Sequence, residues 1–190
     1  MTFPLTLLRL AQPCLFGLAA ASLCYYAYSL VEMSSFQDHQ EARFSQLLAA
    51  PPRENAVPAA SQTLMGRLQI PRLKVSAIVV KGTGEQDLKL GIGHIAGTTM
   101  PGTPGNVGLA GHRDTFFRPL RNIRPQDAIH LTTMEGEFHY RVVSTQIVPP
   151  TSVEVLTPGG GEVLTLVTCY PFFLLGTAPD RFIVRAERVR

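Results

Sequence analysis

The 190-residue sequence has no tryptophan, only three cysteines and few charges, since Asp, Glu, Lys and Arg make up 16% of it. Three cysteines cannot build a disulfide framework. The 17 Lys and Arg against 14 Asp and Glu leave a net charge of +3, a surplus too small and too scattered to indicate a nucleic-acid-binding protein. The 16 glycines and 15 prolines argue against a long-helix bundle and favour a chain with many turns.

Charge is absent altogether from one stretch near the amino terminus. No charged side chain lies between Arg9 and Glu32. Residues 10–31 are therefore long enough to cross a bilayer core as a helix, which takes about 20 residues. Three tyrosines near the downstream end suit the membrane interface, and the arginine upstream places residues 1–9 in the cytoplasm. We predict a single-pass cell-membrane protein whose remaining residues lie outside the cytoplasm.

A cleaved signal peptide is the alternative interpretation of this stretch, with Ala19 and Ala21 at the cleavage site. The apolar run exceeds the about 7–15 residues usual for such a peptide and continues beyond that site. A lipoprotein signal at Cys14 does not fit, because the main apolar run follows this cysteine. An uncleaved anchor is therefore the interpretation that we retain.

A change of composition separates this span from the rest of the chain. Residues 34–50 have a helix-compatible mixture of apolar and polar residues, and Pro51-Pro52 then stops any helix. The following residues are rich in proline and alanine, as in a linker. We therefore predict a stalk and linker over residues 32–62 and a folded domain over residues 63–190.

Short apolar segments separated by glycine and proline fill the predicted domain. Glu135-Gly136 has the composition of a hairpin turn. The strands that we expect are 66–70, 75–80, 107–110, 128–133, 138–148, 162–169 and 182–186, with a short helical turn at 85–90. Seven or eight short strands with little helix predict a mainly β fold, a closed or nearly closed β-barrel, with a sandwich as the alternative.

Cys169 is the one cysteine outside the predicted span. It ends a strand rich in β-branched residues, immediately before Tyr170-Pro171. An unpaired thiol in an oxidising compartment is a liability unless it is buried or used. A rigid strand end is well placed to present a nucleophile, whereas a buried small hydrophobic residue is the alternative. By strand alternation, Thr168 faces the side opposite to Cys169.

A nucleophilic thiol needs a base or a cation nearby. Among the five histidines, His112 directly follows the apolar segment 107–111 and could serve as that base, or it could be a structural histidine. His94 more readily orders a loop through its hydrogen bonds. A zinc site made of these two histidines and Cys169 has weak support, because no ligand pair has the spacing of a zinc finger.

Arg181 follows Cys169 by 12 positions. If residues 162–169 and 181–187 form adjacent antiparallel strands, Arg181 returns beside the thiol. Its guanidinium could then hold a substrate carbonyl and stabilise the oxyanion that forms on attack. The alternative is that Arg181 simply belongs to the polar face of its strand.

Three segments resemble the sortase family. Thr165–Cys169 matches the TLxTC signature of sortases, and its continuation Tyr170-Pro171-Phe172 is similar to that of class D. Residues 105–114 resemble the segment that bears the catalytic histidine of the family, and residues 178–184 resemble the segment that bears its arginine. The resemblance covers roughly residues 64–187.

This resemblance implies an eight-stranded sortase barrel and a cysteine transpeptidase. Cys169 would attack the Thr–Gly bond of a Leu-Pro-x-Thr-Gly-like sorting signal and form a thioacyl enzyme. An amine from a cell-wall precursor or a pilin lysine would then resolve it. His112 would be general acid and base, and Arg181 would stabilise the oxyanion.

The same resemblance implies exported proteins with a carboxyl-terminal sorting signal as partners, and no nucleic acid. We expect no cofactor and no metal, calcium included, although some sortases use calcium. His94, Thr168 and Tyr170 are further candidates for substrate binding. Two other functions stay open: a thiol hydrolase that releases surface proteins, and a membrane-tethered barrel that binds peptides without catalysis.

Overall fold

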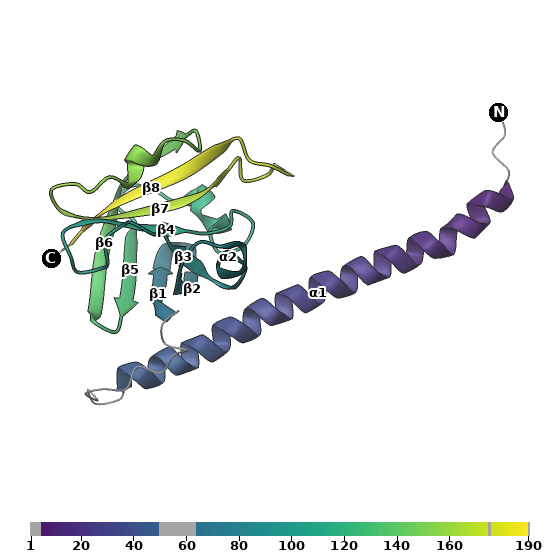
Figure 1. The fold of residues 1–190 in the computed structure, drawn as a ribbon, viewed down its shortest axis with the longest axis horizontal. Coiled ribbons are helices and arrows are strands. Elements are labelled where there is room, and N and C mark those ends of the chain that lie inside the picture. Colours follow the sequence, from purple (N-terminus) through teal and green to yellow (C-terminus); the bar gives the residue numbers. More distant parts are fainter. Residues whose placement is uncertain (1–4, 50–63, 175, 190) are drawn as a thin grey trace. The chain divides into compact units, whose positions relative to one another are not determined.

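The chain forms two compact units, Met1–Phe36 and Gln37–Arg190. The structure is a computed structural model that describes residues 5–49, 64–174 and 176–189. The first unit is the amino-terminal part of a long helix, and the second contains a β-barrel (Figure 1).

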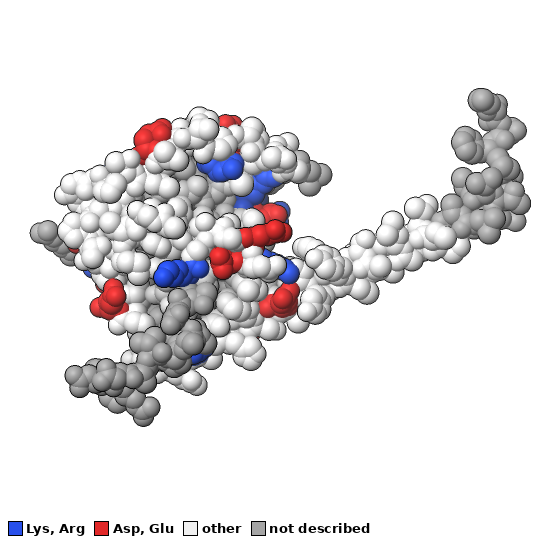
Figure 2. Space-filling view, viewed as in Figure 1, with Lys and Arg blue, Asp and Glu red and all other residues white. Residues whose placement is uncertain are grey.

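Helix α1 (Leu5–Ala49) is one continuous helix, although the sequence indicated two separate segments. Within it, residues Gln12–Ala49 are long and apolar enough to cross a membrane, and the apolar stretch is not buried against protein. The stretch between the first described side chains and Val31 shows no acidic or basic side chain in Figure 2. The helix ends before the Pro51-Pro52 pair, and the predicted linker after that pair lies outside the described residues.

The last turns of α1 belong to the second unit. The Gln37 side chain accepts a hydrogen bond from the Ile78 amide (2.9 Å) and donates one to the Leu90 carbonyl (2.6 Å). The Phe44 side chain is fully buried, with the Arg67 guanidinium carbon 5.9 Å from its ring centroid. Part of the predicted stalk is therefore a packed element of the folded domain.

Eight strands close into a barrel, as the sequence predicted, and the sandwich alternative is excluded. Around the barrel the strands follow the order β1-β2-β3-β4-β7-β8-β6-β5 (Figure 1). Their bounds are β1 (Leu64–Ile70), β2 (Val75–Lys81), β3 (Ile92–His94), β4 (Gly105–Ala110), β5 (Ala128–Thr133), β6 (Gly136–Val148), β7 (Glu162–Tyr170) and β8 (Asp180–Arg188). The short helices are η2 (Pro71–Leu73), α2 (Glu85–Leu90), η3 (Arg118–Asn122) and η4 (Val153–Leu156).

The strands differ in detail from those expected. The predicted hairpin is confirmed, because Thr133 pairs with Gly136 across the turn between β5 and β6. The sequence did not indicate β3, a three-residue strand that begins directly after Gly91. Strand β8 extends beyond both ends of the predicted segment 182–186, because its whole length pairs with β6 or β7.

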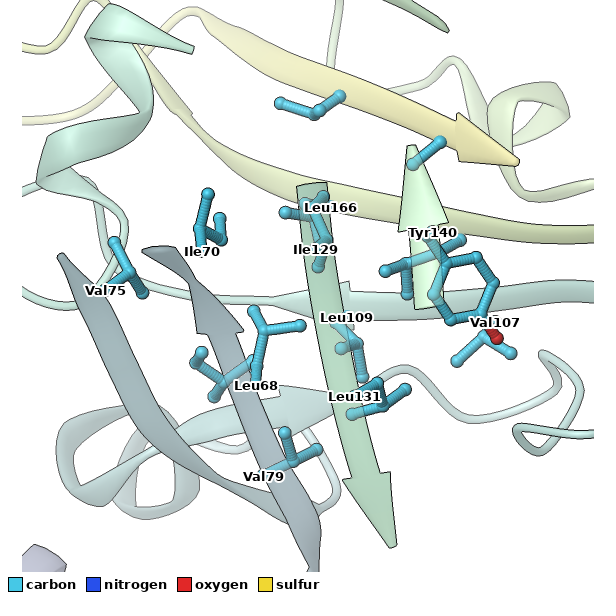
Figure 3. Close-up of a cluster of buried hydrophobic side chains, with 14 of the residues drawn as sticks. Leu68, Ile70, Val75, Val79, Val107, Leu109, Ile129, Leu131, Tyr140 and Leu166 are labelled. Atoms are coloured by element: carbon cyan, nitrogen blue, oxygen red, sulfur yellow. The ribbon is translucent and has the colours of Figure 1, made fainter. Parts of the chain in front are cut away.

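The core occupies the inside of the barrel. Figure 3 shows Leu68 and Ile70 of β1, Leu109 of β4 and Leu166 of β7 among the side chains that fill it. Successive residues of a strand point to opposite faces. The residues between these buried positions therefore face the outer side of the barrel wall.

Tyr140 of β6 is the largest side chain in this core and is 1% exposed. Its hydroxyl has no hydrogen-bond partner among the described residues. Burial raises the pKa of the Tyr140 phenol to about 12, because the charged phenolate is poorly solvated there. The interior of the barrel is therefore apolar enough to hold a phenol neutral.

Candidate active site

Three strand termini meet at one end of the barrel. Strand β7 is parallel to β4 and antiparallel to β8, so β4 and β7 end where β8 begins. Cys169 pairs directly with Arg181 in the β7–β8 register. The Gly111 amide donates a hydrogen bond to the Val167 carbonyl (3.1 Å), which brings the next residue, His112, to the same end. The two strands are adjacent and antiparallel, which is the condition under which the sequence analysis places Arg181 beside the thiol.

Cys169 and Arg181 share the outer face of the barrel wall. Leu166 points into the core three positions before Cys169, and Val184 does so three positions after Arg181. An odd separation along a strand places each pair of residues on opposite faces. The thiol and the guanidinium therefore project from the same outer surface, and all three candidate residues, His112 included, are partly exposed.

The Arg181 guanidinium is held at the start of β8. Its Nη1 donates to the carbonyls of Asp180 (3.0 Å) and Ala178 (3.3 Å). Since a guanidinium carries five N–H donors, others remain for a substrate oxygen. These contacts with neighbouring backbone orient the side chain beside the paired cysteine.

Thr168 lies on the face of β7 opposite to Cys169, as strand alternation predicted; this face is the inner one, and the Thr168 side chain is 2% exposed. Its hydroxyl donates a 2.7 Å hydrogen bond to the Gly111 carbonyl, which joins β7 to the segment that carries His112. Gly111 has no room for a side chain, because a Cβ atom there would lie 2.7 Å from the Phe117 ring. The buried hydroxyl corrects our expectation of a substrate contact: Thr168 fixes the position of the histidine segment.

Arg113 is a residue that sequence reasoning missed. Its guanidinium donates to the carbonyls of Pro171 (2.9 Å), Leu174 (2.7 Å) and Gly176 (2.7 Å) in the β7–β8 loop. The residue after His112 thus fastens the loop that follows Cys169. The sequence does show an arginine directly after the histidine of the motif. It could not show what this arginine binds, because backbone carbonyls are present at every residue and leave no pattern in the sequence.

Tyr170 lies in an aromatic cluster rather than beside the thiol. Its ring stacks on Phe182 with centroids 6.3 Å apart, and the Phe172 ring packs edge-on at 5.3 Å from that of Phe182. Strand alternation places Tyr170 on the face of β7 opposite to Cys169. Its expected role in substrate binding therefore has no support from this placement, in which the Tyr170 ring packs against those of Phe172 and Phe182.

The β6–β7 connection covers part of the outer face. Asn106 of β4 donates to the Val155 carbonyl in η4 (3.0 Å) and accepts from the Thr165 hydroxyl of β7 (2.8 Å). Both polar side chains are fully buried. The connection is thereby fixed over β4 and β7 on the face that also carries Cys169.

His94 is engaged by a neighbouring loop. It ends β3, where it pairs with Leu109 of β4, and its side chain is 7% exposed. Its Nε2 lies 3.1 Å from both the Thr99 carbonyl and the Thr98 hydroxyl. This placement favours the loop-ordering role over substrate contact. In the described part of the chain, no group of three or more His, Cys, Asp or Glu side chains could hold a metal ion.

The comparisons with known proteins concern the barrel domain as a whole. The family model of the sortase domain matches residues 68–189. Sortase D of Bacillus subtilis is 38% identical over 125 residues, which are 65% of this chain and 63% of that protein. Sortase C1 of Streptococcus agalactiae superimposes with a TM-score of 0.64 at 28% identity, over 70% of this chain and 71% of that one.

A barrel with cysteine, histidine and arginine at adjoining strand ends defines a class of thiol enzymes, and this chain belongs to the sortase family. The fold also matches a Clostridium perfringens Sortase D5 transpeptidase, with a TM-score of 0.65 at 23% identity over 83% of this chain and 98% of that one. The match to the Bacillus subtilis relative leaves out over a third of that protein's length.

Proposed function

We propose that this protein is a membrane-anchored cysteine transpeptidase that joins an exported protein to an amine of the cell envelope. The observation that carries the proposal is the direct pairing of Cys169 with Arg181 on one outer face, with His112 at the adjoining strand end. A thiol, an imidazole and a guanidinium around one exposed surface supply the groups that acyl transfer through a thioester requires.

In the first half of the proposed reaction, the Cys169 thiolate attacks the carbonyl carbon of the Thr–Gly bond in a Leu-Pro-x-Thr-Gly-like signal. Arg181 donates hydrogen bonds to the oxyanion that forms. The His112 imidazolium protonates the departing amine, and the threonyl group remains on the sulfur as a thioester.

In the second half, an amine replaces the thiolate. His112, now neutral, takes a proton from the incoming amine as its nitrogen attacks the thioester carbonyl. Collapse of the second tetrahedral intermediate releases the Cys169 thiolate and leaves a new amide bond. In this proposal the loop that Arg113 fastens, which directly follows Cys169, shields the thioester from water on one side and so favours the amine over hydrolysis.

The proposed location follows from helix α1. We place its apolar stretch in the cell membrane as a single span, with residues 1–9 in the cytoplasm and the barrel outside. The partners in this arrangement are exported proteins with a carboxyl-terminal sorting signal and an amine acceptor, either a cell-wall precursor or a pilin lysine.

The proposal is tested with the full chain in neutral detergent, a sorting-signal peptide and a triglycine acceptor. Acid quenching followed by mass spectrometry should show the threonyl adduct on Cys169 and a peptide–triglycine product. Cys169→Ala should abolish both, whereas the matched control Cys24→Ala should keep them. If Cys169→Ala still cleaved the peptide, the assignment of the nucleophile would be wrong.

The same experiment separates the other functions. Cleavage without transfer to triglycine would identify a thiol hydrolase, and saturable peptide binding without an adduct would identify a binding module. We expect a chelator to leave the rate unchanged, because the proposed chemistry needs only the thiol, the imidazole and the guanidinium. A clear loss of rate on chelation, restored by calcium, would contradict that expectation.

A further inference from the structure

A concave site separate from the candidate active site lies at the end of the barrel where β4 and β7 stop. It is a pocket of about 590 Å³ between η2, which joins β1 to β2, and η3, which lies between β4 and β5. This volume falls within the roughly 300–1,000 Å³ of small-molecule sites. Four of its lining residues are cations: Arg72, Lys74, Arg121 and Arg124.

The pocket keeps a surplus of positive charge. Among the described residues, Asp127 is the only carboxylate in an ion pair with any of these cations, and its partner is Arg72. The Arg72 guanidinium lowers the pKa of the Asp127 carboxyl through its hydrogen bonds, so this side chain is ionised at neutral pH. One negative charge against four positive ones leaves three uncompensated.

Two of the four cations, Arg72 and Arg121, have side chains held by contacts within the protein before any ligand arrives. Arg72 donates to both carboxylate oxygens of Asp127 and to the Asn122 carbonyl (2.7 Å). Asp127 also accepts the backbone amide of Arg124 (2.8 Å), which fixes the end of η3 against η2. Arg121 lies with its guanidinium carbon 5.3 Å from the Phe173 ring of the β7–β8 loop. A site built in this way loses little side-chain entropy on binding an anion.

From this geometry we infer that the pocket binds a phosphate-bearing ligand, with a diphosphate or a phosphomonoester as the recognised group. A single carboxylate would neutralise one of the three surplus charges, whereas a phosphate carries a charge of about −1.5 to −2 and several strong acceptor oxygens. Arginine forks match phosphate oxygens in pairs. The phosphate group could belong to a soluble molecule or to a lipid headgroup, because the cations of the pocket would bind the same phosphate oxygens in either case.

The test is titration of the full chain in neutral detergent with inorganic pyrophosphate by calorimetry, at constant ionic strength. We expect saturable binding that weakens about tenfold in each of Arg121→Gln and Arg124→Gln, as for the loss of one charge-assisted hydrogen bond. The matched control is Arg118→Gln, an exposed arginine of η3 that does not line the pocket and should bind as the wild type does. Arg72 is left intact, because its removal would strand a buried Asp127 carboxylate.

Two membrane arms distinguish the source of the phosphate. In nanodiscs that contain phosphatidic acid, whose headgroup is a phosphomonoester, a lipid headgroup in the pocket would suppress pyrophosphate binding by the wild type relative to discs of phosphatidylcholine. Equal binding in both discs would indicate a soluble ligand. The inference is overturned if pyrophosphate does not bind, or if Arg118→Gln weakens binding as much as Arg121→Gln. The Cys169→Ala variant should bind normally, so this result stands apart from the proposed transpeptidase activity.

Discussion

The two ends of the barrel carry different kinds of surface. At one end, His112, Cys169 and Arg181 gather where β4 and β7 stop and β8 begins. At the other end lies a pocket of about 570 Å³ whose lining is mostly apolar and includes Met65 and Met134. The groups for acyl transfer thus lie on an outer face near strand ends and not in this apolar pocket.

The two ends differ in how firmly their side chains are held. The first end has Arg113 fastening the β7–β8 loop and Thr168 fastening the histidine segment, so hydrogen bonds fix the positions of the reactive groups. The second end is lined by methionines, which are flexible and adapt their shape. Chemistry that depends on orientation needs the first kind of support. The predictions below test whether the two ends are separable.

The largest effect is expected from Arg181→Lys at the first end. Lysine keeps the charge but cannot reproduce the planar fork that orients on an oxyanion, so kcat/KM for transfer to triglycine should fall by about 100-fold or more. The matched control is Arg185→Lys, an arginine on the same face of β8, which should stay within about twofold of the wild type. Near-normal turnover in Arg181→Lys would remove this residue from the chemistry.

A smaller effect is expected from Arg113→Gln. The substitution removes the contacts that fasten residues 171–176, so we expect kcat/KM to fall about tenfold, mainly through KM, and Arg113→Lys to restore part of it. Limited proteolysis should cut the loop faster in the variant. Arg141→Gln, on the exposed side of β6, is the control. An unchanged KM with an unchanged cleavage rate would show that the loop holds its shape without Arg113.

Between the two ends, Tyr140→Phe tests the interior. The folded pKa of this phenol is raised to about 12, so its contribution to stability is fully present below the unfolded value near 10 and is lost as the pH rises towards 12. Urea unfolding of the wild type should therefore lose on the order of 2–3 kcal/mol over this window. In Tyr140→Phe the free energy of unfolding should fall less steeply with pH over this range. The variant should be no less stable than the wild type at pH 8, because the Tyr140 hydroxyl has no hydrogen-bond partner among the described residues.

The smallest effect is expected at the opposite end. Met134→Ala removes a half-exposed side chain from the apolar pocket and should leave kcat/KM within about twofold, because it touches no group of the proposed reaction. A loss of tenfold or more, with unchanged stability, would mean that the two ends are coupled.

Much of the candidate site could be predicted from short segments. The motif around Cys169 and the segments with His112 and Arg181 were recognisable, and alternation correctly placed Thr168 on the face opposite to Cys169. The same residues did not reveal that Arg113 reaches the β7–β8 loop, because its acceptors are backbone carbonyls. Nor did they reveal β3, since three residues are too few to show a period.

The sequence by itself determined the local features of this protein: an uncharged helical stretch long enough for a membrane, and strands whose alternation separates core from surface. Only the tertiary structure decided which strands became neighbours. Gly111 and Thr168 are 57 positions apart and meet because β4 and β7 pair in parallel. Local propensity cannot specify such a pairing. The stabilisation from pairing β4 with β7 is gained only after the long chain segment between them, which includes β5 and β6, has brought them together.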